Sequence, residues 1–328
     1  YSSAASDVYK RQNVDSIFLL LIVSFIIGLL TNLYKQLLFA THKSALVDII
    51  YVVQQATIII IVYLISKKSS LTLTHVAIVN GIVPIIISVI FTIGFFNNHK
   101  DLIPNRYNFN SKYISDIFSL GGRFFFIQLS SVIIYSTDNV IISKYLGSSA
   151  VSYYDITGRI FQSVIMFWYI ISSPLTALYS NAYYKNDFIW IVNIIKKLNL
   201  IYILVIILVV LLALFTPAII NIWIGDEILS PISLISFFAA FVLIRIYGDL
   251  YMPFLNAIGI LNYQLYLTVF GAIINIPLSI FLIKFLDLGS SSVILATCIS
   301  LLPLALIAPF QAYKAIYKGN KGNEQKYN

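Results

Sequence analysis

Long apolar runs recur along the whole chain and leave few folds open to it. Nine of these runs, each bounded by polar or helix-breaking residues, are long enough to cross a bilayer core of about 30 Å as a helix. An outer-membrane barrel would instead show alternating segments of about ten residues. The sequence therefore predicts an all-α, polytopic membrane bundle whose nine membrane-spanning helices are residues 16–40, 45–66, 75–96, 119–146, 151–179, 198–219, 229–257, 261–286 and 291–317.

Composition supports a membrane protein and excludes several other classes. The 328 residues are 59% hydrophobic and 10% charged, against about 25% charged in a typical soluble domain. Basic loops that hold membrane topology explain the net charge of +8. Because no basic cluster is interleaved with aromatic residues in a soluble segment, we expect no nucleic-acid partner. The single cysteine, Cys298, excludes an internal disulfide and a cysteine metal cluster.

The distribution of lysine and arginine near the span ends predicts the topology, because basic residues concentrate on the cytoplasmic side. One side holds only Lys67, Lys68, Lys144 and Lys284. The other holds Lys43, Lys100, Arg106, Lys112, Arg123, Lys185, Lys196, Lys197, Lys314, Lys318, Lys321 and Lys326. We therefore expect the C-terminus to lie in the cytoplasm.

The chain divides into segments of different character. Residues 1–12, "YSSAASDVYKRQ", look like translated adapter sequence, so we expect an artefact there and a missing natural N-terminus. A shift of 217 residues lays "LYKQLLFA" at 33–40 on "LYMPFLNA" at 250–257, although chance composition also explains this match. The shift predicts a parallel repeat of two six-helix lobes. The predicted parts are the last three helices of a first lobe (13–96), a cytoplasmic linker (97–118), a second lobe (119–317) and a basic tail (318–328).

Polar side chains fall on one face in three of the predicted spans. Intervals of three, four or seven residues place them on a common helical face. These faces are Gln128, Ser131, Tyr135 and Asp138; Asp155, Arg159, Gln162, Tyr169 and Ser173; and Arg245, Asp249 and Asn256. A single stripe is explained by hydrogen bonds between helices. Three stripes in one bundle favour a shared wet cavity over such structural bonding.

Two further local features follow from spacing. Asp155 and Arg159 are four residues apart, a spacing that allows them to form an ion pair. The polar stretches at 107–118 and 185–197 each predict a short amphipathic helix on the membrane surface.

Catalytic constellations are absent from the sequence. The three histidines, His42, His75 and His99, lie in or beside loops and far apart. There is no HExxH spacing for a metal and no phosphate-binding loop of the Walker type. We therefore expect no enzyme, no bound cofactor and no metal.

Residues 118–161, "FSLGGRFFFIQLSSVIIYSTDNVIISKYLGSSAVSYYDITGRIF", resemble the start of the second lobe of bacterial polysaccharide and O-antigen flippases. These flippases belong to the multidrug/oligosaccharidyl-lipid/polysaccharide exporter (MOP) superfamily. The resemblance rests on "GGRFFFIQ", "TDNVIIS", "LG" and a tyrosine with a basic residue early in the next helix, and it extends over residues 17–317. Family members have further helices before the one that matches residues 16–40.

The resemblance implies that the protein flips undecaprenyl-pyrophosphate-linked oligosaccharide across the bacterial cytoplasmic membrane by alternating access, driven by a Na⁺ or H⁺ gradient or by membrane potential. Its implied partners are the lipid-linked glycan, membrane lipids and other polysaccharide-assembly proteins. Arg159 and Arg245 would meet the pyrophosphate, and Arg123 would attract it at the entrance. Gln128, Tyr135, Gln162 and Asn256 would line the substrate path. Asp138 would bind a cation, exchange a proton or neutralise an arginine, and Asp155 and Asp249 are further coupling or charge-balancing candidates.

Three alternatives remain open from the sequence. A drug or small-cation exporter of the same superfamily would favour acids over arginines in its cavity, and the predicted faces hold both. A membrane-embedded glycan polymerase or ligase would need an acid or histidine near an outer loop. A scaffold without transport activity is the third.

Overall fold

The computed structural model is helical throughout most of its described length. It describes residues 2–41, 43–68, 72–103, 105, 110–225 and 230–327, and gives only the backbone of residues 2–16, 40, 44, 73, 112 and 322–327. Within these residues there are α-helices and one short 3₁₀ helix but no strands. The prediction of an all-α fold is therefore confirmed. Arg106 lies outside this description. So do the side chains of residues 1–12, where the sequence predicts an artefact.

The helices are long and apolar enough to make this a multi-pass membrane protein. In the described part of the chain, eight helical segments pass the length and composition expected of a membrane span. A ninth is the pair α1 (Ser2–Thr31) and α2 (Leu33–Ala40), which bends by 41° at their junction. Large apolar side chains are exposed along these helices, as expected of surfaces that face lipid tails. The predicted count of nine is confirmed when the bent pair is taken as one span.

The chain forms two compact units, unit 1 (Tyr1–Phe109) and unit 2 (Asn110–Asn328). The division falls inside the connection at 97–118 that the sequence predicts as a linker. Unit 1 contains α1, α2, α3 (Ser44–Lys68), α4 (Leu73–Asn98) and the 3₁₀ helix η1 (Lys100–Leu102). Unit 2 contains α5 (Lys112–Ser136), α6 (Asp138–Leu146), α7 (Ser148–Ser172), α8 (Leu175–Tyr184), α9 (Phe188–Ile224), α10 (Ile232–Asp249), α11 (Met252–Ala257), α12 (Asn262–Leu286) and α13 (Ser291–Tyr327).

Polar side chains join three helices of unit 1 at the bend between α1 and α2. Ser88 of α4 donates a hydrogen bond from its hydroxyl to Asn32 Oδ1 over 2.9 Å. Gln54 of α3 donates to the Ser88 hydroxyl and to the Pro84 carbonyl, each over 3.3 Å. Polar residues in the predicted spans of this unit therefore form hydrogen bonds between helices.

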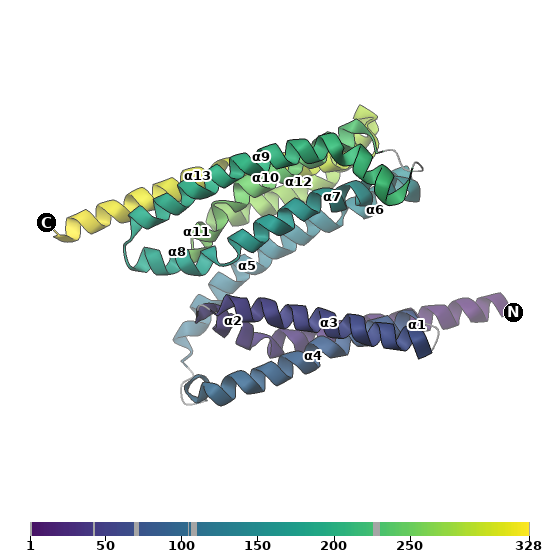
Figure 1. The fold of residues 1–328 in the computed structure, drawn as a ribbon, viewed down its shortest axis with the longest axis horizontal. Helices are drawn as coiled ribbons and strands as arrows, with labels where there is room; N and C mark the ends of the chain where they lie inside the picture. Colours follow the sequence, from purple (N-terminus) through teal and green to yellow (C-terminus); the bar gives the residue numbers. More distant parts are fainter. Residues whose placement is uncertain are drawn as a thin grey trace. The chain divides into compact units, whose positions relative to one another are not determined.

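Unit 2 has the larger core. The helices α9, α10, α12 and α13 run alongside one another (Figure 1), and α10 packs against α7, α9 and α13. Buried aromatic and aliphatic side chains fill the space between them, including Phe161, Tyr179 and Phe254. This packing fixes which faces of α7, α10 and α13 are turned toward one another.

The last helices of the two units follow the same order. Helices α3 and α12 each have 25 residues, and they begin 218 positions apart, at Ser44 and Asn262. Helices α4 and α13 begin at Leu73 and Ser291, which is again 218 positions. Helix α4 packs on α1 and α3, and α13 packs on α10 and α12. The sequence shift of 217 differs from this structural spacing by a single residue.

Three predicted spans of unit 2 are confirmed as single membrane-spanning segments, and each of them contains a short break in its helix. The span at 151–179 breaks at Pro174, and that at 229–257 breaks just before Pro253, because proline lacks the amide hydrogen and crowds the preceding turn. The span at 119–146 breaks at Thr137, whose hydroxyl donates to the Ile133 carbonyl over 2.7 Å. Such back-bonding bends helices and leaves little trace in a sequence.

The two predicted surface helices are also corrected. The described part of 107–118 belongs to the start of α5, and most of 185–197 belongs to α9. Asp187 caps α9 by accepting a hydrogen bond from the Trp190 amide over 3.0 Å. A good cap lets the helix begin before its apolar stretch, so the polar residues extend the membrane helix beyond the bilayer.

Candidate functional site

A cavity of about 450 Å³ lies within unit 2, between α5, α6, α7, α10 and α13. Its wall combines aromatic rings with acidic, basic and amide side chains. The lining residues are Tyr135, Asp138, Tyr154, Asp155, Gly158, Arg159, Gln162, Phe238, Phe241, Arg245, Ile294 and Thr297. Six of the residues predicted from the sequence are thus brought together: Tyr135, Asp138, Asp155, Arg159, Gln162 and Arg245.

Helical periodicity explains how two helices present this wall. The lining residues of α7 run from Tyr154 to Gln162 at alternating steps of one and three, which is one helical face. On α10, Phe238, Phe241 and Arg245 are separated by three and four residues. Each helix therefore turns one continuous stripe toward the cavity and its apolar remainder toward the core or lipid.

Asp138 lies in the first turn of α6, directly after the break at Thr137. It is 5% exposed, and Oδ2 accepts a short hydrogen bond from the Tyr154 hydroxyl. A carboxylate is also favoured near a helix N-terminus, where the backbone amides point toward it. The other oxygen, Oδ1, is buried and has no hydrogen-bond partner among the described residues. Asp138 is therefore a buried acid whose polar neighbours are the hydroxyls of Tyr154 and Thr297.

A second buried polar pair stands in the same part of the bundle. Asn275 of α12 is fully buried, and its Nδ2 donates to Thr297 Oγ1 over 3.1 Å. Thr297, which lines the cavity with Asp138, also donates to the Val293 carbonyl over 3.3 Å. Asn275 Oδ1 has no partner in the part of the chain that the structure describes. Buried oxygens of this kind are costly unless a ligand, an ion or water satisfies them.

The ion pair that spacing allows between Asp155 and Arg159 is not formed. Asp155 instead accepts a hydrogen bond from Asn139 Nδ2 over 2.9 Å. The Arg159 side chain is exposed at the cavity, and within the described chain it has no ion-pair or hydrogen-bond partner. Spacing allowed the pair, but the neighbouring helix supplied a competing donor to the carboxylate. The Arg159 guanidinium is thus free to meet a ligand.

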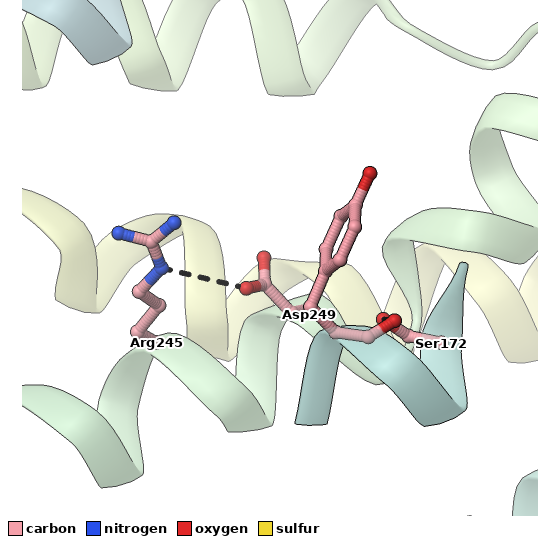
Figure 2. A network of polar contacts seen from close by, with 4 residues as sticks. Ser172, Arg245 and Asp249 are labelled. Atoms are coloured by element: carbon pink, nitrogen blue, oxygen red, sulfur yellow. Dashed lines mark hydrogen bonds and ion pairs between the residues drawn. The ribbon is translucent and has the colours of Figure 1, made fainter. Parts of the chain in front are cut away.

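Arg245 forms the single ion pair that the described residues contain. Its Nε lies 3.6 Å from Asp249 Oδ2, one helical turn further along α10, and Figure 2 marks this contact. The Arg245 guanidinium also lies over the Tyr135 ring, 4.3 Å from its centroid. Side-chain exposure is 26% for Arg245 and 43% for Asp249, so solvent weakens the pair. Neutralising an arginine was one of three functions expected of Asp138. The acid that pairs with Arg245 is instead Asp249.

Gly158 allows α7 to approach α10 closely. A Cβ atom at this position would stand 3.1 Å from the Phe238 ring. Phe238 in turn lies against Tyr154, with ring centroids 4.9 Å apart. The missing side chain therefore lets the Phe238 ring reach the wall that carries Tyr154 and Asp138.

Four predicted residues do not line the cavity. Arg123 donates to Asn262 Oδ1 over 3.0 Å, and Gln128 is exposed elsewhere on α5. Asn256 lies on α11, and Asp249 reaches the cavity only through Arg245. Gln128 shares a helical face with Asp138, but ten residues of helix separate them by about 15 Å. A common face therefore did not guarantee a common site.

Six cavity residues were missed by the sequence reasoning: Tyr154, Gly158, Phe238, Phe241, Ile294 and Thr297. Extending the Arg245 stripe backward by four and three residues would have found Phe241 and Phe238. The residues of α13 carry no such signal, because apolar and small polar residues alternate freely in a buried helix.

Tyr154→Phe is expected to destabilise unit 2. It removes the donor to Asp138 and leaves a buried carboxyl oxygen unpaired, which costs about 1–3 kcal/mol. The measurement is the unfolding midpoint of purified protein in detergent. Tyr153→Phe removes a hydroxyl from the neighbouring, half-buried residue and is the matched control. Equal midpoints for the two variants would show that the hydrogen bond to Asp138 contributes nothing to stability.

The side chains present are suited to binding an organic molecule. Within the described residues there is no group of three or more histidine, cysteine and acidic side chains that could hold a metal ion. The cavity offers two guanidinium groups, two carboxylates, an amide and several aromatic rings. Such a wall can hold an amphipathic organic molecule by stacking, ion pairing and hydrogen bonding.

Comparison with known proteins identifies the fold. Residues 124–281 match the model of the MatE family. No curated protein matches this chain at a significant level. An outward-facing multidrug resistance MATE family transporter of the MOP superfamily is 15% identical, with a TM-score of 0.70 over 94% of this chain and 78% of that one.

Two further solved structures are similar. A MATE protein in the straight conformation is 14% identical, with a TM-score of 0.71 over 94% of this chain and 79% of that one. An inward-facing multidrug resistance MATE family transporter is 16% identical, with a TM-score of 0.63 over 92% and 71%. The chain therefore has the fold of the MATE transporters, and the cavity lies within the stretch from α5 to α13 that includes the family match.

Proposed function

We propose that this protein is a membrane transporter that moves an amphipathic organic solute by alternating access, and that the cavity of unit 2 forms part of its transport path. The observation that carries the proposal is a charged and aromatic cavity inside a membrane bundle with the MATE fold. Charged side chains in hydrocarbon are costly and persist where they face water or a ligand. Arg159, exposed at the cavity without a protein partner, is such a side chain.

For the substrate, the comparisons favour export of drug-like solutes over the flipping of lipid-linked oligosaccharide. The similar solved structures include multidrug resistance transporters, and residues 124–281 match the same family. The cavity fits this substrate class through Tyr135, Phe238 and Phe241, whose rings offer flat apolar surfaces, and through Asp138 and Asp155, which attract cations.

Flipping of an undecaprenyl-pyrophosphate-linked glycan is the second candidate. The observation that favours it is the presence of Arg159 and Arg245 in one cavity, because guanidinium groups bind phosphate oxygens in a bidentate manner. Arg245 already faces Asp249 and Tyr135, so Arg159 would make the first contact. Other polysaccharide-assembly proteins would be partners only under this candidate.

Coupling to a Na⁺ or H⁺ gradient belongs to the same proposal, with the cation as a second substrate that is exchanged for the solute. Asp138 is the candidate group, because it is buried and lines the cavity, with the hydroxyls of Tyr154 and Thr297 as its polar neighbours and no hydrogen bond to Oδ1 within the described residues. Binding of a cation or proton there would satisfy that oxygen. Asp155 is the weaker candidate, since it is more exposed and already accepts from Asn139.

We further propose that the protein lies in a bacterial cytoplasmic membrane with its C-terminus in the cytoplasm. The end of α13 and the connection from α8 to α9 lie at the same end of unit 2 (Figure 1). That end carries Lys185, Lys196, Lys197, Lys314, Lys318 and Lys321. A basic end of a bundle is typical of the cytoplasmic side.

The test uses the gene in a bacterial strain that lacks its own drug exporters, and it measures efflux of the cationic dye ethidium. Cells that express the protein are expected to lose dye faster than vector controls, and a protonophore or the removal of Na⁺ is expected to abolish the difference. In parallel, proteoliposomes carry a labelled undecaprenyl-pyrophosphate-linked glycan whose exposure in the outer leaflet is followed.

The two assays separate the candidates. Efflux of dye without movement of the glycan supports the drug exporter, and the reverse supports the flippase. Protein that folds and inserts but moves neither compound, under either gradient, would overturn the proposed transport function.

A further inference from the structure

A groove of about 610 Å³ lies between the start of α9 and the end of α13 in unit 2. It is separate from the cavity around Asp138 and shares no lining residue with it. The residues that line it are Phe188, Ile189, Val192, Asn193, Lys196, Tyr313, Ile316, Tyr317 and Asn320. Along α9 the lining residues are first apolar and then polar, so that both kinds of group reach the groove.

The apolar part of the groove is built by close helix packing. Phe188 and Ile316 are buried, whereas Ile189 and Tyr317 are largely exposed. Gly319 lets the Phe188 ring approach α13, because a Cβ atom there would stand 2.6 Å from two ring carbons. The groove therefore has a firm apolar floor and an open mouth.

The mouth of the groove is basic. Lys196 lines it directly, and the Lys321 ammonium lies 5.0 Å from the centroid of the Tyr317 ring, which also lines it. Asn193 and Asn320 add amide donors that have no hydrogen-bond partner within the described chain. No acidic side chain is found among the lining residues. The groove is therefore suited to a negatively charged group.

The groove also stands at the level where α9 changes character. Phe188 to Lys197 holds both lysines of α9, and the following turns carry Leu200, Ile203 and Leu204 exposed to the surroundings. Tyrosine side chains such as Tyr313 and Tyr317 favour the interface between hydrocarbon and water. A molecule with its charged end in the groove would thus have its apolar part lie along α9 in the bilayer.

From these features we infer that the groove binds an anionic phospholipid, with the phosphate at Lys196 and Lys321 and the acyl chains along the exposed face of α9. Basic pockets between membrane helices hold lipid headgroups in this way. The two ammonium groups neutralise the phosphate, and the amides of Asn193 and Asn320 donate to its oxygens. A zwitterionic lipid brings its own cation to the same place and is bound more weakly.

The test measures lipid binding to the purified full chain in a non-ionic detergent, by native mass spectrometry. The probes are dioleoylphosphatidylglycerol, dioleoylphosphatidylcholine and inorganic phosphate. We expect saturable binding of the phosphatidylglycerol, weaker binding of the phosphatidylcholine and no competition from phosphate. Replacing Lys196→Gln together with Lys321→Gln is expected to raise the Kd for phosphatidylglycerol by about thirtyfold.

The matched control replaces Lys197→Gln and Lys318→Gln, which removes the same charge from exposed neighbours that do not line the groove. This control is expected to leave the Kd unchanged. A second variant, Asn193→Asp, keeps the shape but adds a negative charge, and it is expected to weaken binding as well.

Three results would overturn the proposal. Equal weakening by the two lysine pairs would indicate a diffuse basic surface. Equal affinity for phosphatidylcholine would indicate that only the acyl chains bind, and displacement of the lipid by inorganic phosphate would indicate a site for free anions. Failure of the transport assays leaves this inference standing, because lipid binding is read out without transport.

Discussion

Asp138→Asn is expected to abolish gradient-driven transport while the protein still folds. Asparagine has nearly the same shape and keeps an oxygen that accepts the Tyr154 hydroxyl, so the hydrogen bond to α7 survives. The negative charge that would attract a cation or carry a proton is lost. If one cation is coupled per cycle, a potential of about 100 mV contributes about 2.3 kcal/mol, or roughly fifty-fold in accumulation.

The measurement is substrate accumulation in proteoliposomes with an imposed Na⁺ or H⁺ gradient, alongside the unfolding midpoint in detergent. Asp155→Asn makes the same chemical change in the same cavity, at a half-buried acid that accepts from Asn139. We expect the Asp155 variant to retain most gradient dependence. If Asp138→Asn still accumulates substrate as the unaltered protein does, then Asp138 has only a structural function in α6.

Replacing Arg159→Gln and Arg245→Gln is expected to separate the two candidate substrates. Hydrogen bonds to charged groups contribute about 1.5–3 kcal/mol, so an anionic substrate would lose about tenfold or more in transport per arginine. A cationic drug would lose little, and its transport would rise if repulsion limits binding. Glutamine keeps donors and much of the length of the side chain, so the comparison isolates the charge.

Folding and transport must be separated for these two residues. Arg159 has no protein partner in the described chain, so its replacement is expected to leave the unfolding midpoint unchanged. Arg245→Gln leaves Asp249 unpaired and is expected to lower the midpoint slightly, by about 1 kcal/mol or less given the exposure of the pair. Arg123→Gln, outside the cavity, is the control for charge removal. If the variant of a cavity arginine loses no more transport than Arg123→Gln does, that arginine does not contact the substrate.

Part of the candidate site was predictable because helical periodicity is local. Arg159 and Gln162 reach the cavity beside Asp155, as their spacing predicted, and Arg245 follows on α10. Spacing did not predict where each stripe ends. Gln128 and Asn256 share faces with cavity residues but lie away from the cavity, because the length and breaks of a helix decide which turns face its neighbours.

The partners of the charged groups were not predictable from spacing. Spacing allowed Asp155 to pair with Arg159 on its own helix, but Asn139 of α6 bonds to it. Asp138 was expected to balance an arginine, but Tyr154 of α7 donates to it. Both partners lie on α6 or α7, which are joined by the tight turn at Gly147. The break at Thr137 sets the direction of α6, and so it decides which residues of α6 face α7.

What the sequence by itself determined is the class of the protein. Apolar runs long enough to cross a bilayer leave a helical membrane bundle as the available fold, since backbone groups in hydrocarbon must bond within their own segment. What only the tertiary structure decided is the site: which turns of α5, α6, α7, α10 and α13 meet, and how Asp138 and Arg245 are paired. Apolarity and periodicity belong to single segments, whereas a cavity depends on packing between helices that lie far apart in the chain.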